Sequence, residues 1–169
     1  MITTPRLRLR RPELSDFDDY QAMWSHPDIL VHMSSGSFTA EQMWTRFLRQ
    51  AGGWHYLGFG YFSIEERETK RFVGQIGFQD LRREISPSLE GSMEAGWTIH
   101  PQAQGLGYAG EAARGLFDWG AENFSGKRAT CIIAPENGPS LRIAAKMGMT
   151  EFARSTYQDK PVVMFERVL

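Results

Sequence analysis

The sequence has one cysteine in 169 residues, no long apolar run and almost no net charge. A lone cysteine, Cys131, cannot form a disulfide within the chain, which is expected of a protein in a reducing compartment. The first residues alternate arginine with leucine, unlike the apolar core of a signal peptide. No stretch approaches the roughly 20 apolar residues of a membrane span. We therefore expect a cytoplasmic protein with no membrane partner.

The charged residues nearly balance, with 19 lysines and arginines against 20 aspartates and glutamates. A net charge of -1 gives no broad positive field, so we expect no nucleic-acid partner. The four histidines lack the spacing of metal ligands, and no metal site is expected. The hydrophobic fraction of 41% is typical of a globular protein, and we expect residues 1–169 to form a single domain.

Hydrophobic periodicity divides the chain into strands and helices. Two-residue alternation predicts strands with one buried face, and steps of three and four residues predict helices. The strands expected are residues 6–10, 56–65, 72–81, 89–100, 129–134, 152–157 and 162–168. The helices expected run from a cap at Ser15 or Asp16 to His26-Pro27, from a capping box at Thr39 to Gly52-Gly53, over residues 106–124, and over residues 140–147.

The order of these elements, β-α-α-β-β-β-α-β-α-β-β, predicts a mixed α/β (α+β) domain. Short breaks between the three strands of residues 56–100 favour hairpins and antiparallel pairing. The strand, helix and strand of residues 89–134 are typical of a parallel β-α-β unit. Residues 31–38 are small and polar and are expected to form a loop. We therefore expect a mostly antiparallel sheet around one β-α-β unit.

A glycine-rich segment, residues 102–110, separates a strand from the long helix. Glycine lets the main chain approach a ligand closely, and the first turn of a helix favours a phosphate or pyrophosphate. The spacing Gly105-x-Gly107-x-x-Gly110 also matches the dinucleotide fingerprint, which would indicate a dinucleotide-dependent oxidoreductase. That alternative requires the first glycine directly after the strand, whereas about five residues intervene here.

The same segment resembles a second pattern. It reads Gln102-x-x-Gly105-x-Gly107, similar to the pyrophosphate loop (Gln/Arg)-x-x-Gly-x-(Gly/Ala) of the GNAT superfamily of acetyl-CoA-dependent N-acetyltransferases. Two further stretches, residues 4–10 (TPRLRLR) and 94–101 (EAGWTIHP), resemble the ribosomal-protein acetyltransferase (RimJ/RimL-type) branch of that family. Residues 137–149 (NGPSLRIAAKMGM) resemble the second cofactor segment of the family. The resemblance spans nearly the whole chain and implies the GNAT fold, with acetyl-CoA as cosubstrate.

The resemblance also implies which residues hold the cofactor. The N–H groups of the loop are expected around the pyrophosphate, and one strand is expected beside the pantetheine arm, where it diverges from residues 129–134. Asn137 and Ser140 are implied as further contacts, although Asn137 is also a good helix cap. The residues expected in the loop and the strand are Gln104, Gly105, Leu106, Gly107, Tyr108, Ala109, Trp97, Thr98 and Ile99.

Two residues are expected to move protons, and one of them, Glu94, matches a position of the family. Glu94 stands where many members keep a carboxylate that deprotonates the amine, often through water, although a salt bridge is its alternative role. Ser140 lies at a helix start, where its hydroxyl is placed to protonate the leaving thiolate. Many relatives have a tyrosine for this step at the position of Ala144, so the acid is expected to be Ser140, water or another side chain such as Tyr157.

The motifs leave the acceptor amine open. The branch implies a protein N-terminus or a small-molecule amine, direct transfer in a ternary complex, and a homodimer. The aromatic residues of segment 54–62, interpreted first as strand core, and the loop 31–38 are expected near the acceptor. The alternative from a different functional class is a non-catalytic domain that binds acyl-CoA as a sensor.

Overall fold

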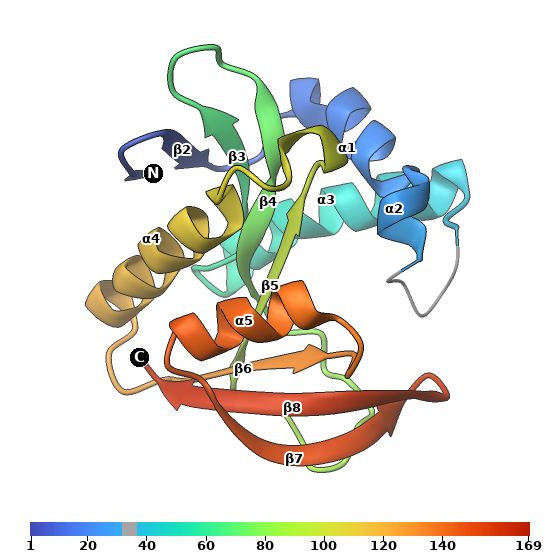
Figure 1. Ribbon diagram of the computed structural model, residues 1–169, viewed down its shortest axis with the longest axis vertical. Helices are drawn as coiled ribbons and strands as arrows, with labels where there is room; N and C mark the ends of the chain where they lie inside the picture. The colour runs from blue at the N-terminus through green and yellow to red at the C-terminus, as the bar shows by residue number, and fades with distance from the viewer. Residues whose placement is uncertain (32–36) are drawn as a thin grey trace.

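The computed structural model describes residues 1–31 and 37–169, which form one eight-stranded sheet with five α-helices packed on it (Figure 1). The strand order is β1-β2-β3-β4-β5-β6-β8-β7, and all neighbours are antiparallel except β5 and β6. The strands are β1 (Ile2–Thr3), β2 (Leu7–Arg10), β3 (Tyr61–Glu66), β4 (Phe72–Gln79), β5 (Met93–Ile99), β6 (Arg128–Ile133), β7 (Thr150–Tyr157) and β8 (Lys160–Val168). The expected mixed α/β fold with one central β-α-β unit is confirmed.

The helices occupy the expected places with two differences in number and extent. They are α1 (Phe17–Trp24), α2 (Pro27–Leu30), α3 (Ala40–Tyr56), α4 (Tyr108–Asn123) and α5 (Gly138–Lys146). The short strand β1 and the single turn α2 were not expected, and α2 begins at the proline that was interpreted as a break, because proline suits the first helical position. Most of the predicted loop 31–38 lies outside the described residues.

The predicted end of the second helix is wrong. Helix α3 continues through Gly52-Gly53 to Tyr56, so β3 begins at Tyr61 and not at Tyr56. The Trp54 indole N–H donates to the Tyr61 carbonyl (2.8 Å), which ties the last turn of the helix to the strand. A Cβ at Gly53 would lie 3.1 Å from the Phe59 carbonyl, so this glycine allows close packing instead of ending the helix.

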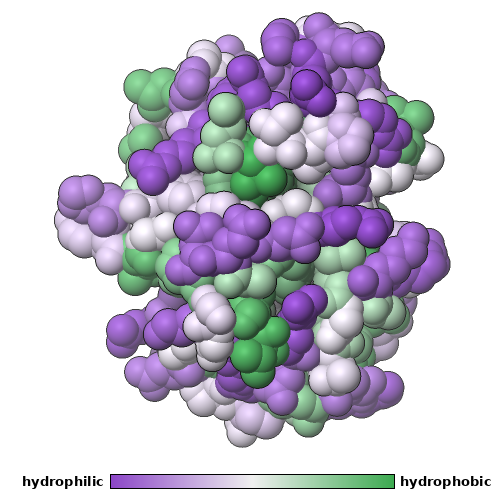
Figure 2. Space-filling model, turned by 90° about the vertical axis from the view of Figure 1, so that its left-hand side faces the viewer, coloured by the Kyte–Doolittle hydropathy of each residue, from purple (hydrophilic) through white to green (hydrophobic). Residues whose placement is uncertain are grey.

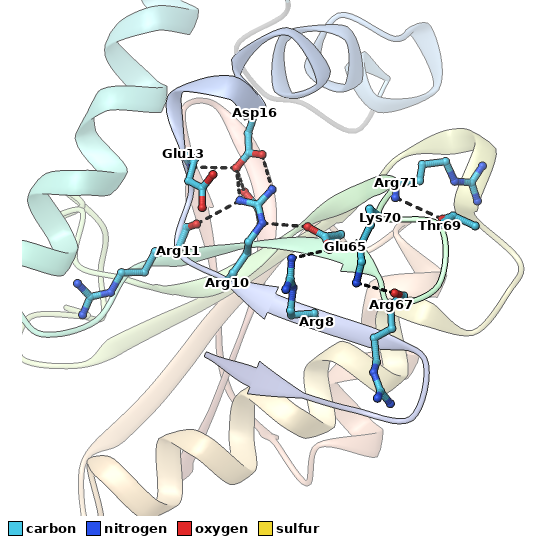
Figure 3. A network of polar contacts seen from close by, with 11 residues as sticks. Arg8, Arg10, Arg11, Glu13, Asp16, Glu65, Arg67, Thr69, Lys70 and Arg71 are labelled. Atoms are coloured by element: carbon cyan, nitrogen blue, oxygen red, sulfur yellow. Dashed lines mark hydrogen bonds and ion pairs between the residues drawn. The ribbon is translucent and has the colours of Figure 1, made fainter.

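Asp16, one of the two predicted caps, stands at the N-cap position of α1, but its side chain makes no capping hydrogen bond there because its carboxylate is used elsewhere. Leu7 and Leu9 of β2 face the core, whereas Arg8 and Arg10, which alternate with them, face the other side of the sheet. There the Arg10 guanidinium donates two hydrogen bonds to Asp16 (2.6 and 2.8 Å) and one to Glu65 (3.0 Å), as Figure 3 shows. This buried network joins the start of α1 to the sheet.

Both carboxyl groups of this network have lowered pKa values. Burial by itself would raise the pKa of Asp16, but the hydrogen bonds from Arg10, from the Glu13 N–H and from the Ser63 hydroxyl outweigh it. Burial would likewise raise the pKa of Glu65, but the hydrogen bonds from Arg10 and Arg8 outweigh it, and the pKa is lowered. Both side chains therefore remain ionised to lower pH in the folded protein than in the unfolded chain.

The free energy of unfolding should consequently fall as the pH drops from about 5 to about 3, where the unfolded chain takes up protons before the folded one does. Each such carboxyl contributes at most about 1.4 kcal/mol per pH unit. In Asp16→Asn the dependence on pH should be weaker, whereas Asn in place of the exposed Asp118 should leave it unchanged. Urea unfolding across this pH range measures the slopes, and equal slopes for Asp16→Asn and the wild type would contradict the assignment.

The core fixes the elements that border the cavity described below. Helix α4 packs on the sheet through its buried face, on which Ala113, Leu116 and Phe117 lie. A Cβ at Gly120 would lie 3.0 Å from the Phe78 ring, so this glycine brings the helix close to β4. The loop before α4 and the strand β5 are therefore held by the same packed core.

The surface seen from the side of the N-terminus and α4 is mostly hydrophilic, with apolar residues in small separate patches (Figure 2). Within the part of the chain that the structure describes, no helix has the length and apolar character needed to cross a membrane.

Candidate active site

The sheet opens between β5 and β6. These two parallel strands pair only at Met93–Ala129 and Glu94–Thr130. Beyond that point β5 continues along β4 as far as Ile99, and β6 continues along β8 as far as Ile133. The edge of β5 that faces β6 therefore has no strand beside it from Ala95 onward.

A cavity of about 1460 Å³ includes this opening. It extends from the glycine-rich loop and the start of α5, past β5, to α1 and α3. This volume exceeds that of a common small-molecule pocket, which is about 300–1,000 Å³. Of the residues predicted for the site, those that line it are Glu94, Trp97, Thr98, Ile99, Gln104, Gly105, Gly107, Tyr108, Ala109, Asn137 and Ser140.

The glycine-rich loop has the backbone that glycine permits. Gly105 and Gly107 have φ angles of +79° and +80°, in the left-handed region, and Gly107 is the N-cap residue immediately before α4. The first hydrogen bond of the helix runs from the Glu111 N–H to the Gly107 carbonyl. The N–H groups of the residues between them consequently have no carbonyl within the helix, as at any helix start. They are available to an anion, which the helix dipole also favours.

The outer side of this loop is bound to the N-terminal strands. Arg6 donates from Nη1 to the Leu106 carbonyl (2.9 Å) and from Nε to Glu111 (2.7 Å), while Thr4 donates to the same carboxylate (2.6 Å). The Leu106 side chain is 48% exposed and lies outside the cavity lining. Leu106 can therefore contribute to the cavity only through its main chain.

The Tyr108 side chain also points toward the N-terminal strands. Its hydroxyl donates to Glu66 (2.7 Å), and the Arg6 guanidinium lies 4.8 Å from the ring centre. The hydrogen bond from Arg71, with those from Thr69 and Tyr108, lowers the pKa of Glu66 to about 2. The tyrosine thereby fixes the first turn of α4 beside β3.

Trp97 and Ser140 face each other across the opening of the sheet. The Trp97 indole N–H donates to the Ser140 Oγ (3.1 Å), and the Ser140 main-chain N–H donates to Asn137 Oδ1 (3.1 Å). Asn137 thus caps α5, the role that its residue type favours. Because the Ser140 oxygen accepts the bond from Trp97, its own hydroxyl proton remains available to a further acceptor.

The position of the usual family tyrosine faces away from the cavity. Ala144 is fully buried in the core, so no side chain there points into the opening. Tyr157, the other candidate named from the sequence, does line the cavity, with the Arg83 guanidinium 4.6 Å from its ring centre.

Glu94 is buried and lies at the last position where β5 pairs with β6, so the sheet opens immediately after it. Arg83 donates from Nε to Oε2 (2.6 Å) and from Nη2 to Oε1 (2.7 Å), and Gln79 donates to Oε1 (3.2 Å). A carboxylate has about four acceptor positions, and three of them are used here. The remaining position on Oε2 is free for an incoming amine or water. Both roles weighed for this residue, a base and a salt-bridge partner, are compatible with this geometry.

Tyr61 is a cavity residue that the motifs did not single out. It comes from β3, and a Cβ added at Gly96 would clash with the Tyr61 hydroxyl oxygen, so only glycine permits this contact. Burial and the Glu94 carboxylate raise the pKa of Tyr61, so the hydroxyl keeps its proton. The aromatic segment 54–62 was the only signal for this residue in the sequence.

Cys131 lines the same cavity as a buried thiol, 3.6 Å from the Met149 sulfur. Burial and then the charge of Glu94 raise the pKa of its thiol, which disfavours a reactive thiolate. Among the described residues, no three histidine, cysteine, aspartate or glutamate side chains lie close enough together to hold a metal ion.

The fold and the sequence match those of known acetyltransferases. The model of the acetyltransferase (GNAT) domain family matches residues 6–150. The uncharacterized N-acetyltransferase p20 of Bacillus licheniformis is 30% identical over 143 residues, which cover 84% of this chain and 78% of that protein. The structure of a GnaT-family acetyltransferase from Bordetella pertussis has a TM-score of 0.89 and 27% identity, covering 99% of this chain and 98% of the other.

The chain therefore belongs to the GNAT family of acetyltransferases, and it is an N-acetyltransferase that uses acetyl-CoA. The dinucleotide alternative is wrong, because the strand before the loop lies in a mostly antiparallel sheet and a turn of 3-10 helix separates the two.

More distant solved structures share the fold. A spermidine N-acetyltransferase from Vibrio cholerae, in complex with CoA and spermine, has a TM-score of 0.76 at 15% identity, with 96% of this chain and 95% of that chain covered. A ribosomal-protein-S5-alanine acetyltransferase from Vibrio fischeri has a TM-score of 0.75 at 16% identity, with coverages of 96% and 92%. At these identities the likeness extends to the fold and not to the acceptor.

Proposed function

We propose that the protein transfers an acetyl group directly from acetyl-CoA to a primary amine while both are bound. The observation that carries this proposal is one continuous cavity, which borders the glycine-rich loop before α4, the unpaired edge of β5, and the residues of α1 and α3. Its volume of about 1460 Å³ is large enough for two ligands side by side. Direct transfer needs no covalent intermediate on the protein.

The residues around the opening suit acetyl-CoA. The loop of Gln104–Ala109, with two left-handed glycines and the first N–H groups of α4, would hold the pyrophosphate. The free edge of β5 at Trp97, Thr98 and Ile99 would pair with the pantetheine arm, and Asn137 and Ser140 border it on the other side. When bound, acetyl-CoA supplies the acetyl group as a thioester.

Glu94 and Ser140 are the proposed proton carriers. Glu94 would take the proton of the amine at Oε2, directly or through a water, while Arg83 holds the carboxylate in place. Ser140 would give its hydroxyl proton to the departing sulfur, helped by the positive end of α5. Trp97 orients the Ser140 oxygen, and position 144 holds a buried alanine in place of the tyrosine that many relatives use for this role.

The resemblance to the RimJ/RimL branch is also part of the proposal. A protein N-terminus or a small amine is the acceptor that this branch suggests, and the distant neighbours named for a ribosomal protein and for spermidine give one example of each. We further propose that residues 1–169 act as one acetyltransferase domain in the cytoplasm and that the protein forms a homodimer.

The release of CoA in the presence of amines tests this function. A thiol reagent measures free CoA while acetyl-CoA and a panel of amines are supplied, and mass spectrometry identifies the acetylated amine. Amine-dependent release is expected. If the protein binds acetyl-CoA but none of the amines causes release of CoA, it is instead a non-catalytic acyl-CoA-binding domain.

In the same assay, Ser140→Ala should lower kcat about 10- to 100-fold with little change in KM for the amine, because the leaving group loses its acid. Ser140→Thr keeps a hydroxyl and should retain most of the rate. A kcat for Ser140→Ala equal to that of the wild type would transfer this role to water or to Tyr157.

A further inference from the structure

The part of the cavity near α1, α3 and β3 carries positive charge that no carboxylate compensates. Its ionisable groups influence one another electrostatically and belong to Tyr20, Arg46, Arg49, Tyr61, Arg83 and Glu94. Glu94 is the one carboxylate of this set, and Arg83 already neutralises it. Among the described residues neither Arg46 nor Arg49 forms an ion pair, and residues 32–36 contain no aspartate or glutamate.

Arg46 has hydrogen-bonding capacity to spare. Its guanidinium lies against two rings, 4.9 Å from the ring centre of Trp24 and 4.4 Å from that of Phe38. The buried Nε of Arg46 and the buried indole nitrogen of Trp24 have no hydrogen-bond partner among the described residues. Buried donors without a partner are costly, and an incoming ligand with acceptor oxygens would relieve that cost.

Arg49 lies three residues further along α3 and lines the cavity, and part of its surface is exposed. Partial burial of its guanidinium and then the like charge of Arg46 lower the pKa of Arg49. Two cations without a counter-ion therefore repel each other here. An anion bound between them would remove the repulsion.

We propose that the acceptor is an amine that also carries an anionic group, a carboxylate or a phosphate, and that Arg46 and Arg49 bind this group while the amine lies at Glu94. The inference rests on the proposed acetylation of an amine and adds the class of amine. A polycation such as spermidine, whose other amines would lie against the two arginines, is excluded as the preferred acceptor.

Matched pairs of amines test this specificity. Phenylalanine against phenethylamine, and phosphoethanolamine against ethanolamine, differ within each pair by the anionic group alone, and the two pairs distinguish a carboxylate from a phosphate. For the wild type we expect kcat/KM to be about tenfold or more higher for the anionic member of at least one pair. Spermidine should be a poorer acceptor than that member.

Three variants assign the preference to the arginine. Arg49→Gln should reduce the preference about tenfold, by lowering kcat/KM for the anionic amine and sparing the neutral one. Arg49→Lys keeps the charge and should restore much of it. Arg114→Gln removes a charge from the exposed face of α4, outside the cavity, and should change nothing. Arg49 is chosen because it is exposed, whereas Arg46 packs against two rings.

Binding gives a second readout that does not need turnover. The thermal shift produced by phenylalanine and by phosphoethanolamine is measured with CoA present, for the wild type and for Arg49→Gln. If amines are acetylated without preference for an anionic group, the inference is overturned and the proposed function stands. If no amine is acetylated but an anionic ligand binds in an Arg49-dependent way, the function is wrong and the anion site stands. If neither occurs, both are overturned.

Discussion

Gly107→Glu is expected to abolish the binding of acetyl-CoA, with a dissociation constant higher by about three orders of magnitude. The φ angle of +80° makes any L residue at this position unfavourable, by about 1–2 kcal/mol. The larger effect is the new charge at the helix start that we assign to the pyrophosphate. A like charge about 4 Å away costs about 4 kcal/mol at an effective dielectric constant of about 20, or nearly a thousandfold.

The added carboxylate would also disturb Arg6, since the Arg6 Nη2 lies 3.5 Å from the position of a Cβ on Gly107. Two controls separate charge from strain. Gly107→Ala carries the strain alone and should bind only moderately less well. Gly126→Glu has the same left-handed backbone, with a φ of +81°, but lies outside the cavity and should bind normally. Titration calorimetry with acetyl-CoA measures all three, and tight binding by Gly107→Glu would overturn the loop assignment.

Glu94→Gln is expected to lower kcat by a factor of about 100 to 10,000, the usual contribution of a positioned general base. The amide keeps the shape of the side chain but cannot take the proton of the amine. Acetyl-CoA affinity should change little, because the cofactor is proposed to bind along β5 beyond this residue. Steady-state kinetics with a saturating amine, together with calorimetry for acetyl-CoA, separates the two quantities.

The matched control for this substitution is Glu65→Gln. Glu65 is also a buried glutamate held by arginines, Arg8 and Arg10, but it lies outside the cavity. Its replacement should destabilise the fold without lowering kcat of the folded protein. If Glu94→Gln loses stability as Glu65→Gln does but keeps the wild-type kcat, Glu94 is a structural ion-pair partner and another group is the base.

The sequence was most informative where function and local structure use the same residues. The glycines of residues 105–110, the asparagine that caps α5, and the strand before the loop are each visible in short patterns, because backbone conformation and helix caps depend on neighbours in the chain. In the structure the cofactor residues predicted from these patterns line one cavity, except Leu106. The antiparallel order and the single parallel pair followed from the lengths of the connections.

Contacts between distant segments could not be predicted in this way. Arg83, in the loop between β4 and β5, pairs with Glu94 of β5, and Tyr61 occupies the space above Gly96 only because β3 lies in the same sheet. The two arginines of α3 read as ordinary surface residues of a helix until the fold places them at the cavity. Contacts of this kind depend on strand register and on packing, and neither can be determined from a single sequence.

Helix ends were the other weak point, for a physical reason. Gly52-Gly53 looked like a stop signal, since glycine is a poor helix former. The burial of Trp54 and its bond to the Tyr61 carbonyl outweigh that preference and carry α3 on for another turn. Asp16 does stand at the start of α1, but its carboxylate binds Arg10 and makes no capping hydrogen bond, a tertiary contact that the local pattern could not indicate.

The binding of acetyl-CoA at the opened sheet is the central claim, and a comparison of melting temperatures tests it most directly. The wild-type protein and Gly107→Glu are heated with acetyl-CoA, free CoA or NADH at matched concentrations. A ligand at 100 times its dissociation constant adds about 2.7 kcal/mol to the free energy of unfolding. We predict a clear rise for the wild type with both CoA compounds, none with NADH, and none for Gly107→Glu. No rise with either CoA compound, or an equal rise in the variant, would contradict the account.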